Sequence, residues 1–112
     1  SPRCPLPEAR MIAAFKAALS HPHPSPRVLA TYGDYAWNAL RDRPLGLSLT
    51  TAAVAARPTE PAYRITLARM LAAEDRHAEA RQQIKALEAL NYGGRLDADI
   101  AGLRMVVGGN GA

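Results

Sequence analysis

The sequence predicts an all-α domain of about six helices, and three observations lead to this prediction. Ala, Leu and Arg, which all favour helix, dominate the 112 residues. Most of the nine prolines and eight glycines lie between the Ala- and Leu-rich runs rather than within them. Few segments are Val-, Ile- and Thr-rich with the two-residue period of a strand. We therefore expect one domain over residues 1–112, made of helices joined by short loops.

The first two predicted helices cover residues 8–19 and 27–40. Apolar side chains recur on one face of each segment with helical spacing. Ser25 is a suitable N-cap for the second helix, and Pro26 suits its first turn. Gly33 lies inside that helix, where glycine costs about 1 kcal/mol relative to alanine. We therefore expect another helix to pack closely against Gly33.

The third and fourth predicted helices cover residues 44–56 and 60–74. Asp42 is placed to cap the third helix and Thr59 to cap the fourth. Pro58 ends the third helix, because a proline disfavours helical geometry in the residue before it.

The last two predicted helices cover residues 76–90 and 98–107. Asp75 and Asp97 are placed to cap them, so the final helical element spans 97–107. Residues 108–112 are rich in glycine and are predicted to be a disordered tail.

A period of about 34 residues runs through this pattern. In residues 61–94, Leu67 is followed by Ala68, and Leu71 fills the next large position of the first helix. Ala80 is the small residue near the start of the second helix, and Ile84 and Leu87 follow at packing positions. Small residues allow two helices to approach closely, while large residues fill the space between neighbours. This segment resembles one tetratricopeptide repeat.

The resemblance implies antiparallel helix pairs stacked as a short right-handed superhelix. Residues 27–60 match the pattern as a divergent repeat, and residues 8–26 as a truncated one. Residues 97–107 would then form the capping helix of a protein-binding or scaffolding module. An unrelated helical bundle is the alternative.

The resemblance also implies a binding groove on the concave face, lined by the first helix of each repeat. Thr31, Tyr35 and Asn38 share one face of the second helix. Arg69 occupies the position of Tyr35 one repeat later, so we expect the two side chains to be neighbours. Tyr35 would supply rigid contact area, and Arg69 could bind a carboxylate of a partner peptide. The alternative is that these residues are ordinary helix surface.

The composition argues against several other classes of protein. The net charge is +4, with scattered cations rather than a basic stripe, so a nucleic-acid adaptor is a less favoured alternative. His21 and His23 have no further ligands at metal-binding spacing. No nucleophile–base pair or phosphate-binding loop is present. We therefore predict no catalytic residue, cofactor or metal. Since short repeat arrays expose apolar ends, a homodimer through the first or last helix is a further alternative.

Three segments carry a second resemblance: YAWNAL at 35–40, PAYRI at 61–65 and GRLDADI at 94–100. They are similar to the C-terminal parts of bacterial multi-pass membrane proteins of glycan assembly. This resemblance implies an accessory soluble domain of a membrane-bound glycosyltransferase or O-antigen ligase-like protein. Such a domain would face the periplasm from the inner membrane, with a cytoplasmic location as the alternative. No apolar run here approaches the ~18 residues of a membrane span, so membrane contact would come from another part of the parent protein.

Overall fold

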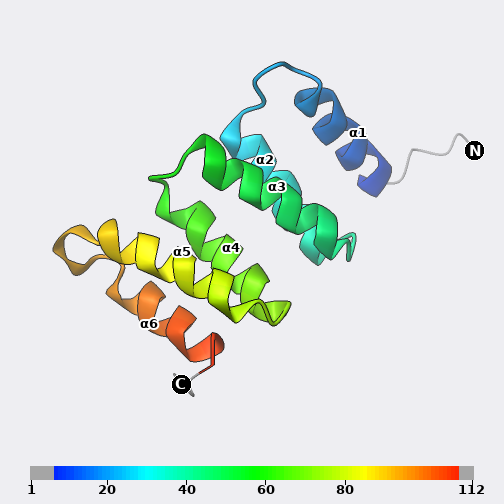
Figure 1. Ribbon diagram of the computed structural model, residues 1–112. Coiled ribbons are helices and arrows are strands. Elements are labelled where there is room, and N and C mark those ends of the chain that lie inside the picture. Colours follow the sequence, from blue (N-terminus) through cyan, green and yellow to red (C-terminus); the bar gives the residue numbers. More distant parts are fainter. Residues whose placement is uncertain (1–6, 109–112) are drawn as a thin grey trace, which may run out of the picture.

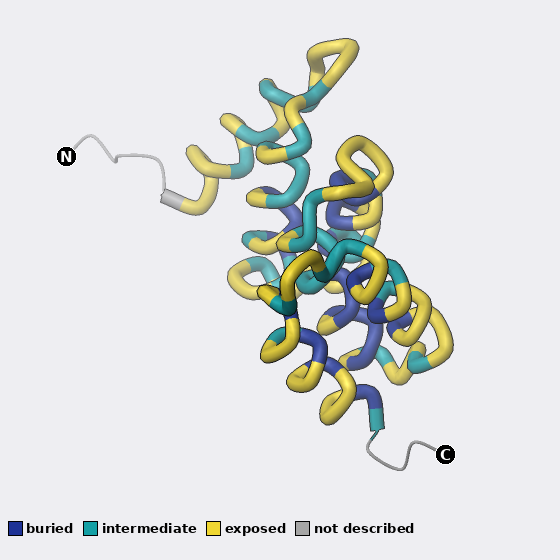
Figure 2. The backbone as a smooth tube through the Cα atoms, turned by 90° about the vertical axis from the view of Figure 1, so that its left-hand side faces the viewer, coloured by how far each residue is buried: buried dark blue, intermediate teal, exposed yellow. Residues whose placement is uncertain are grey.

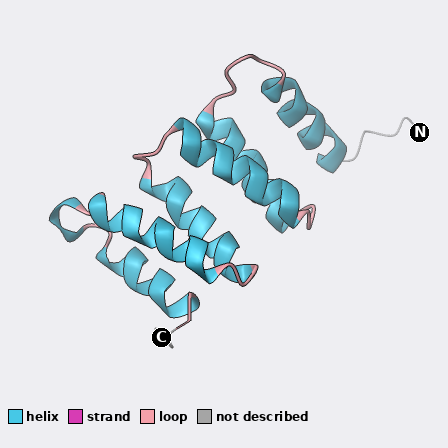
Figure 3. Cartoon of the chain, viewed as in Figure 1, coloured by secondary structure: helices cyan, strands magenta, loops and turns pink. Residues whose placement is uncertain are grey.

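The computed structural model describes residues 7–108, which form α-helices and no strand (Figures 1 and 3). The predicted all-α fold of about six helices is confirmed for these residues. Each helix begins and ends within two residues of its predicted bounds. The α-helices in this range are α1 (Pro7–Leu19), α2 (Pro26–Asn38), α3 (Arg43–Ala56), α4 (Pro61–Ala73), α5 (His77–Ala89) and α6 (Asp97–Val106), with a short 3-10 helix, η1 (Tyr92–Gly94), before α6.

Consecutive helices run antiparallel and follow one another along an elongated molecule (Figure 1). Its principal extents are 57 × 27 × 20 Å. The closest pairs are α2 with α3 and α4 with α5, and α6 packs on both α4 and α5. Helix α1 contacts α2 at the opposite end. Helices α1 to α5 therefore pack mainly on their neighbours in the sequence, whereas α6 packs equally on α4 and α5.

Two glycines bring the backbones of α2 and α3 into contact. A Cβ atom on Gly33 would lie 2.6 Å from Thr50 Oγ1 and 3.2 Å from the carbonyl oxygen of Gly46. A Cβ atom on Gly46 would lie 2.9 Å from the Cβ of Trp37 and 3.0 Å from the carbonyl oxygen of Gly33. Contacts of this kind are too short for any residue but glycine. The expected close approach of a second helix at Gly33 is confirmed, and α3 is that helix.

Figure 2 shows in dark blue the stretches of the backbone whose residues are buried. Most of the buried apolar residues form a large and a small cluster. The small cluster, here called the N-terminal core, joins α1, α2 and α3 and consists of Tyr32, Ala36 and Leu49 with partly buried neighbours. The large cluster, here called the C-terminal core, lies between α3, α4, α5 and α6. It consists of Val54, Leu67, Ala68, Leu71, Ala72, Ala80, Ile84, Leu87, Leu96, Ile100, Leu103 and Val107.

The helix starts confirm two predicted caps and correct a third. The side chain of Ser25 accepts a hydrogen bond from the backbone N–H of Arg27, and that of Asp42 accepts one from Leu45. Thr59, however, does not cap α4. Glu60 is the N-cap, and its carboxylate accepts from the N–H of Ala62 at 3.4 Å.

The predicted caps at Asp75 and Asp97 are also wrong. Asp75 has a φ of 60°, in the left-handed region, and Arg76 follows as the N-cap of α5 without a side-chain hydrogen bond. Asp97 is already in the first turn of α6, where its charge is favourable to the helix dipole. Its Oδ1 accepts a hydrogen bond of 2.7 Å from Asn91 Nδ2. Both acids lie next to a helix start, but α5 is capped one residue later than expected and α6 one residue earlier.

None of the helices in residues 7–108 is long and apolar enough to cross a bilayer. Of the tail predicted to be disordered, residues 109–112 lie outside the described residues, and Gly108 lies in a turn with a φ of 104°.

Candidate binding groove

Helices α2 and α4 present polar faces on the same side of the molecule. Ser25 and Pro26 fix where α2 starts, and Glu60 and Pro61 do the same for α4. The buried residues of each helix face the two cores, so the opposite side chains are left on the surface. These surface positions are Thr31, Asp34 and Asn38 on α2, and Ala62, Thr66 and Arg69 on α4.

Two adjoining hollows lie between these faces, with volumes of about 270 and 240 Å³. Asp34 and Thr66 line both hollows, so the two hollows adjoin, and together they are here called the α2–α4 groove. The first hollow is also lined by Ala30, Thr31, Thr50, Ala62 and Tyr63, and the second by Trp37, Asn38, Arg69 and Met70.

The walls of the α2–α4 groove offer charges of both signs and hydrogen-bonding groups. Asn38 Nδ2 donates to the carbonyl oxygen of Asp34 at 3.0 Å and to Asp34 Oδ1 at 3.1 Å. The amide oxygen of Asn38 therefore remains as an acceptor. Arg69 is exposed on the opposite wall, and no ion pair within residues 7–108 engages it. Its guanidinium can donate to a bound carboxylate.

Arg43 of α3 ties the two walls together at one end of the groove. Its guanidinium lies 4.7 Å from the centre of the Trp37 ring on α2. Its Nη1 donates to Glu74 Oε2 at the end of α4, at 2.7 Å. This arrangement makes the partly buried Trp37 a wall of the second hollow as well as a packing residue.

The floor of the first hollow contains an unusual polar group. Thr50 is 1% exposed, and its Oγ1 has no hydrogen-bond partner among the described residues. The close approach of Gly33 covers this hydroxyl. A buried hydroxyl without a partner lowers stability by about 1–3 kcal/mol.

The structure brings three of the four predicted groove residues together. Thr31, Asn38 and Arg69 all line the α2–α4 groove. Tyr35, which was expected beside Arg69, instead packs on Phe15 of α1, with 5.8 Å between ring centres. This contact partly buries Tyr35, and that burial, followed by the nearby negative charge of Glu8, raises the pKa of its hydroxyl. Tyr35 is therefore an interhelical contact and not part of the groove.

Sequence reasoning missed Asp34 and Thr66, the two residues shared by both hollows. The helical spacing could have indicated both residues. Asp34 lies three residues after Thr31 and four before Asn38, and so shares their helix face. Thr66 lies three residues before Arg69 in the same way. The repeat pattern pointed to Tyr35 instead of Asp34, which is one residue and about 100° of helix rotation away.

Among the described residues, no group of three His, Cys, Asp or Glu side chains could hold a metal ion. His21 and His23 are both exposed in the α1–α2 loop. Comparison with protein-family models, curated proteins and solved structures found no match for this chain.

Proposed function

We propose that this domain is a protein-interaction module that binds an extended peptide segment of a partner in the α2–α4 groove. The observation that carries the proposal is the groove itself, in which Thr31, Asn38 and Arg69 meet around Asp34 and Thr66. The antiparallel order of the helices also supports a tetratricopeptide-like stack, in which α2 and α4 are the first helices of neighbouring repeats.

The dimensions and chemistry of the groove favour a short extended segment. From Thr31 to Asn38, α2 rises by about 10 Å, which matches about three residues of extended chain. The threonine hydroxyls and the Asn38 amide oxygen can bond to a peptide backbone, since hydroxyls both donate and accept. Arg69 favours an acidic side chain in the bound segment. Asp34 favours a basic side chain, one or two residues along the segment from the acidic one.

We also propose a setting for the module, on the strength of the second resemblance alone. It would be an accessory domain of a bacterial inner-membrane protein of glycan assembly, exposed to the periplasm. An immunoblot of fractionated native cells tests this. A band well above the 12.0 kDa of this chain, in the membrane fraction, is expected. A band of this mass in the soluble fraction contradicts the proposed setting but not the peptide-binding function.

Selection from a random peptide library tests the binding function. We expect the selected peptides to share an acidic residue. Titration calorimetry should show that Arg69→Ala weakens the best peptide about tenfold or more, because a hydrogen bond between charged groups contributes about 1.5–3 kcal/mol. Asn38→Ala should weaken binding less, since it removes a neutral acceptor.

Arg10→Ala provides the matched control, because Arg10 is an exposed arginine on α1, away from the groove. The Arg10→Ala variant should bind the selected peptide with the affinity of the wild type. Equal binding by the wild type and Arg69→Ala, or failure to select any peptide, contradicts the proposed function.

A further inference from the structure

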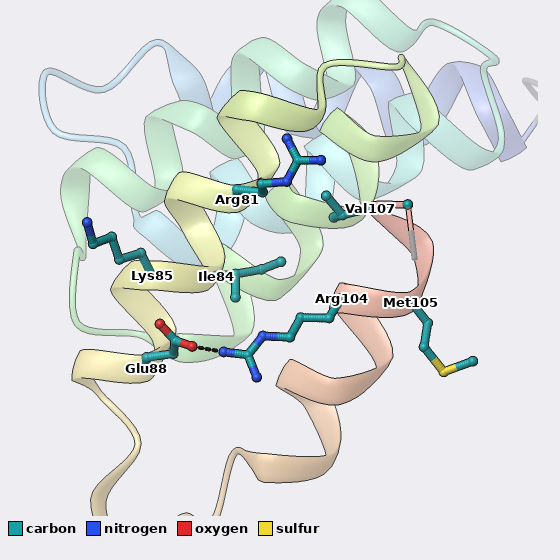
Figure 4. A pocket seen from close by; sticks show the side chains of 8 residues that line it. Arg81, Ile84, Lys85, Glu88, Arg104, Met105 and Val107 are labelled. Carbon is teal, nitrogen blue, oxygen red and sulfur yellow. Dashed lines mark ion pairs between the residues drawn. The ribbon is translucent and has the colours of Figure 1, made fainter. Parts of the chain in front are cut away.

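A second concave surface lies between α5 and α6, on a different pair of helices from the α2–α4 groove (Figure 4). Its volume is about 560 Å³, more than either hollow of that groove. We call it the α5–α6 cleft. It is lined by Arg81, Ile84, Lys85, Glu88, Arg104, Met105, Val107 and Gly108.

The floor of the α5–α6 cleft is apolar. Ile84 and Val107 belong to the C-terminal core and lie at its bottom, between the two helices (Figure 4). On the α6 side, Met105 is 78% exposed and points outward. Its neighbour Val106 is 55% exposed. An apolar floor with an exposed methionine at its edge is typical of surfaces that bind the apolar face of a helix.

The rim of the cleft carries an excess of positive charge. It contains three cations, Arg81, Lys85 and Arg104, against one carboxylate, Glu88. Arg104 pairs with Glu88 across the cleft (Figure 4). Within residues 7–108, neither Arg81 nor Lys85 has an ion-pair partner. Two positive charges therefore border an apolar surface with no internal carboxylate to neutralise them.

We propose that the α5–α6 cleft binds an acidic amphipathic helix of a partner protein. Arg81 and Lys85 are four residues apart on α5, and so lie about 6 Å apart along its axis. A helix aligned with α5 would meet them with acidic residues at positions i and i+4. Its apolar stripe would lie on Ile84, Val107 and the exposed side of Met105. The opposite charges of the two surfaces would also accelerate their association.

The charges favour such a partner over a second copy of this chain. The apolar helix at the other end of the molecule, α1, carries Arg10 and Lys16 against a single acid, Glu8. Docking α1 of a second copy into the cleft would bring like charges together, which is unfavourable.

Fluorescence anisotropy with a synthetic peptide tests the proposal. The probe is a labelled peptide of about four helical turns, with a leucine stripe flanked by glutamates at i, i+4 spacing. A control peptide has glutamine in place of each glutamate. At low salt we expect the glutamate peptide to bind about tenfold more tightly than the control, and this preference to fall as salt is added.

The paired variants Arg81→Glu and Lys85→Glu, made together, should weaken the glutamate peptide by about tenfold or more. The matched control combines Arg10→Glu with Lys16→Glu, which changes the net charge equally on exposed positions of α1. This control should keep the wild-type affinity. Circular dichroism should show all variants folded, because the replaced side chains are exposed.

Three results would overturn the proposal. The first is equal affinity of the wild type for the glutamate and glutamine peptides, or no binding of either. The second is undiminished binding by the Arg81→Glu, Lys85→Glu variant. The third is a wild-type dimer in sedimentation equilibrium that this same variant converts to a monomer, which would make a second copy the occupant.

Discussion

The two terminal helices, α1 and α6, both end the stack but differ in how they are attached. Helix α6 is anchored in the C-terminal core, where Ile100, Leu103 and the adjoining Val107 are buried. By contrast, none of residues 8–19 in α1 is buried. The main contact of α1 is the ring of Phe15, which stacks on Tyr32 with 4.6 Å between ring centres and an angle of 8°.

The loops that connect α1 and α6 to the rest of the molecule also differ in how firmly they are held. Between α5 and α6, Asn91 holds the chain through both ends of its amide. Its Oδ1 accepts from the N–H of Leu96, and its Nδ2 donates to Asp97, each at 2.7 Å. Between α1 and α2, the sequence His21-Pro22-His23-Pro24 has three exposed residues and one that is half-buried. The hydrogen bonds of this loop are local to the helix ends.

A helix at the end of this stack is therefore only as stable as the core that it completes. Removing α6 would expose the C-terminal core, so α6 should unfold together with α4 and α5. Removing α1 would expose mainly the rings of Tyr32 and Tyr35, so α1 can separate while the rest stays folded.

The largest expected effect comes from truncating one buried side chain at each end. Leu103→Ala should lower the free energy of unfolding by about 3 kcal/mol, because Leu103 is 1% exposed and its loss leaves a cavity. Phe15→Ala should lower it by about 1 kcal/mol or less while hydrogen exchange in α1 becomes faster. Urea unfolding followed by circular dichroism measures both. Equal losses for the two variants would remove the distinction between the ends.

An intermediate effect should come from two glycine-to-alanine changes of identical chemistry. Gly46→Ala should destabilise the protein by about 1–2 kcal/mol, since the new Cβ would crowd Trp37 and the backbone of Gly33. Gly102→Ala in α6 should stabilise it by about 0.5–1 kcal/mol, because no atom lies within 4 Å of the new Cβ and alanine favours helix. Thermal unfolding measures the two shifts. A stabilising Gly46→Ala would contradict the tight α2–α3 contact.

The smallest effect concerns the ionisation of Tyr35 at the α1–α2 contact. Its folded-state pKa is raised, first by partial burial and then by Glu8. Tyr35 therefore stabilises the fold fully below its ordinary pKa of about 10, and this contribution is lost as pH rises through the raised value. Phe15→Ala should lower the pKa of Tyr35 by exposing the ring, and Glu8→Gln should lower it less.

The absorbance of tyrosinate, with Tyr35→Phe subtracted to isolate one residue, gives the pKa of Tyr35 in each variant. If neither Phe15→Ala nor Glu8→Gln lowered the pKa of Tyr35, the described packing of α1 on α2 would be wrong.

Local sequence signals were sufficient for the helices. Proline positions and apolar spacing predicted all six, and the cost of glycine inside a helix correctly predicted the close contact at Gly33. The caps at Thr59, Asp75 and Asp97 were wrong because several polar residues stand at each helix start. Which of them caps depends on backbone angles, such as the left-handed φ of Asp75, that the residue types alone do not determine.

The candidate groove depended on contacts that are distant in sequence. The repeat period predicted that Thr31, Asn38 and Arg69 would share one side of the molecule, and all three line the α2–α4 groove. It placed Tyr35 wrongly because the packing of α1 on α2 decides where that ring lies, and the weak pattern of residues 8–19 did not indicate Phe15 as its partner. The charged rim of the α5–α6 cleft was not expected from the sequence, because it depends on how α6 sits against α5.

The packing of α1 to α5 mainly on their sequence neighbours also affects the order and speed of folding. Pairs such as α2 with α3 close short loops, so little chain entropy is lost before the stabilising contacts form. Proteins with such local contacts fold in microseconds to milliseconds. On a ribosome, α2 and α3 could pair before α6 had been synthesised, whereas the C-terminal core would have to wait for the last helix.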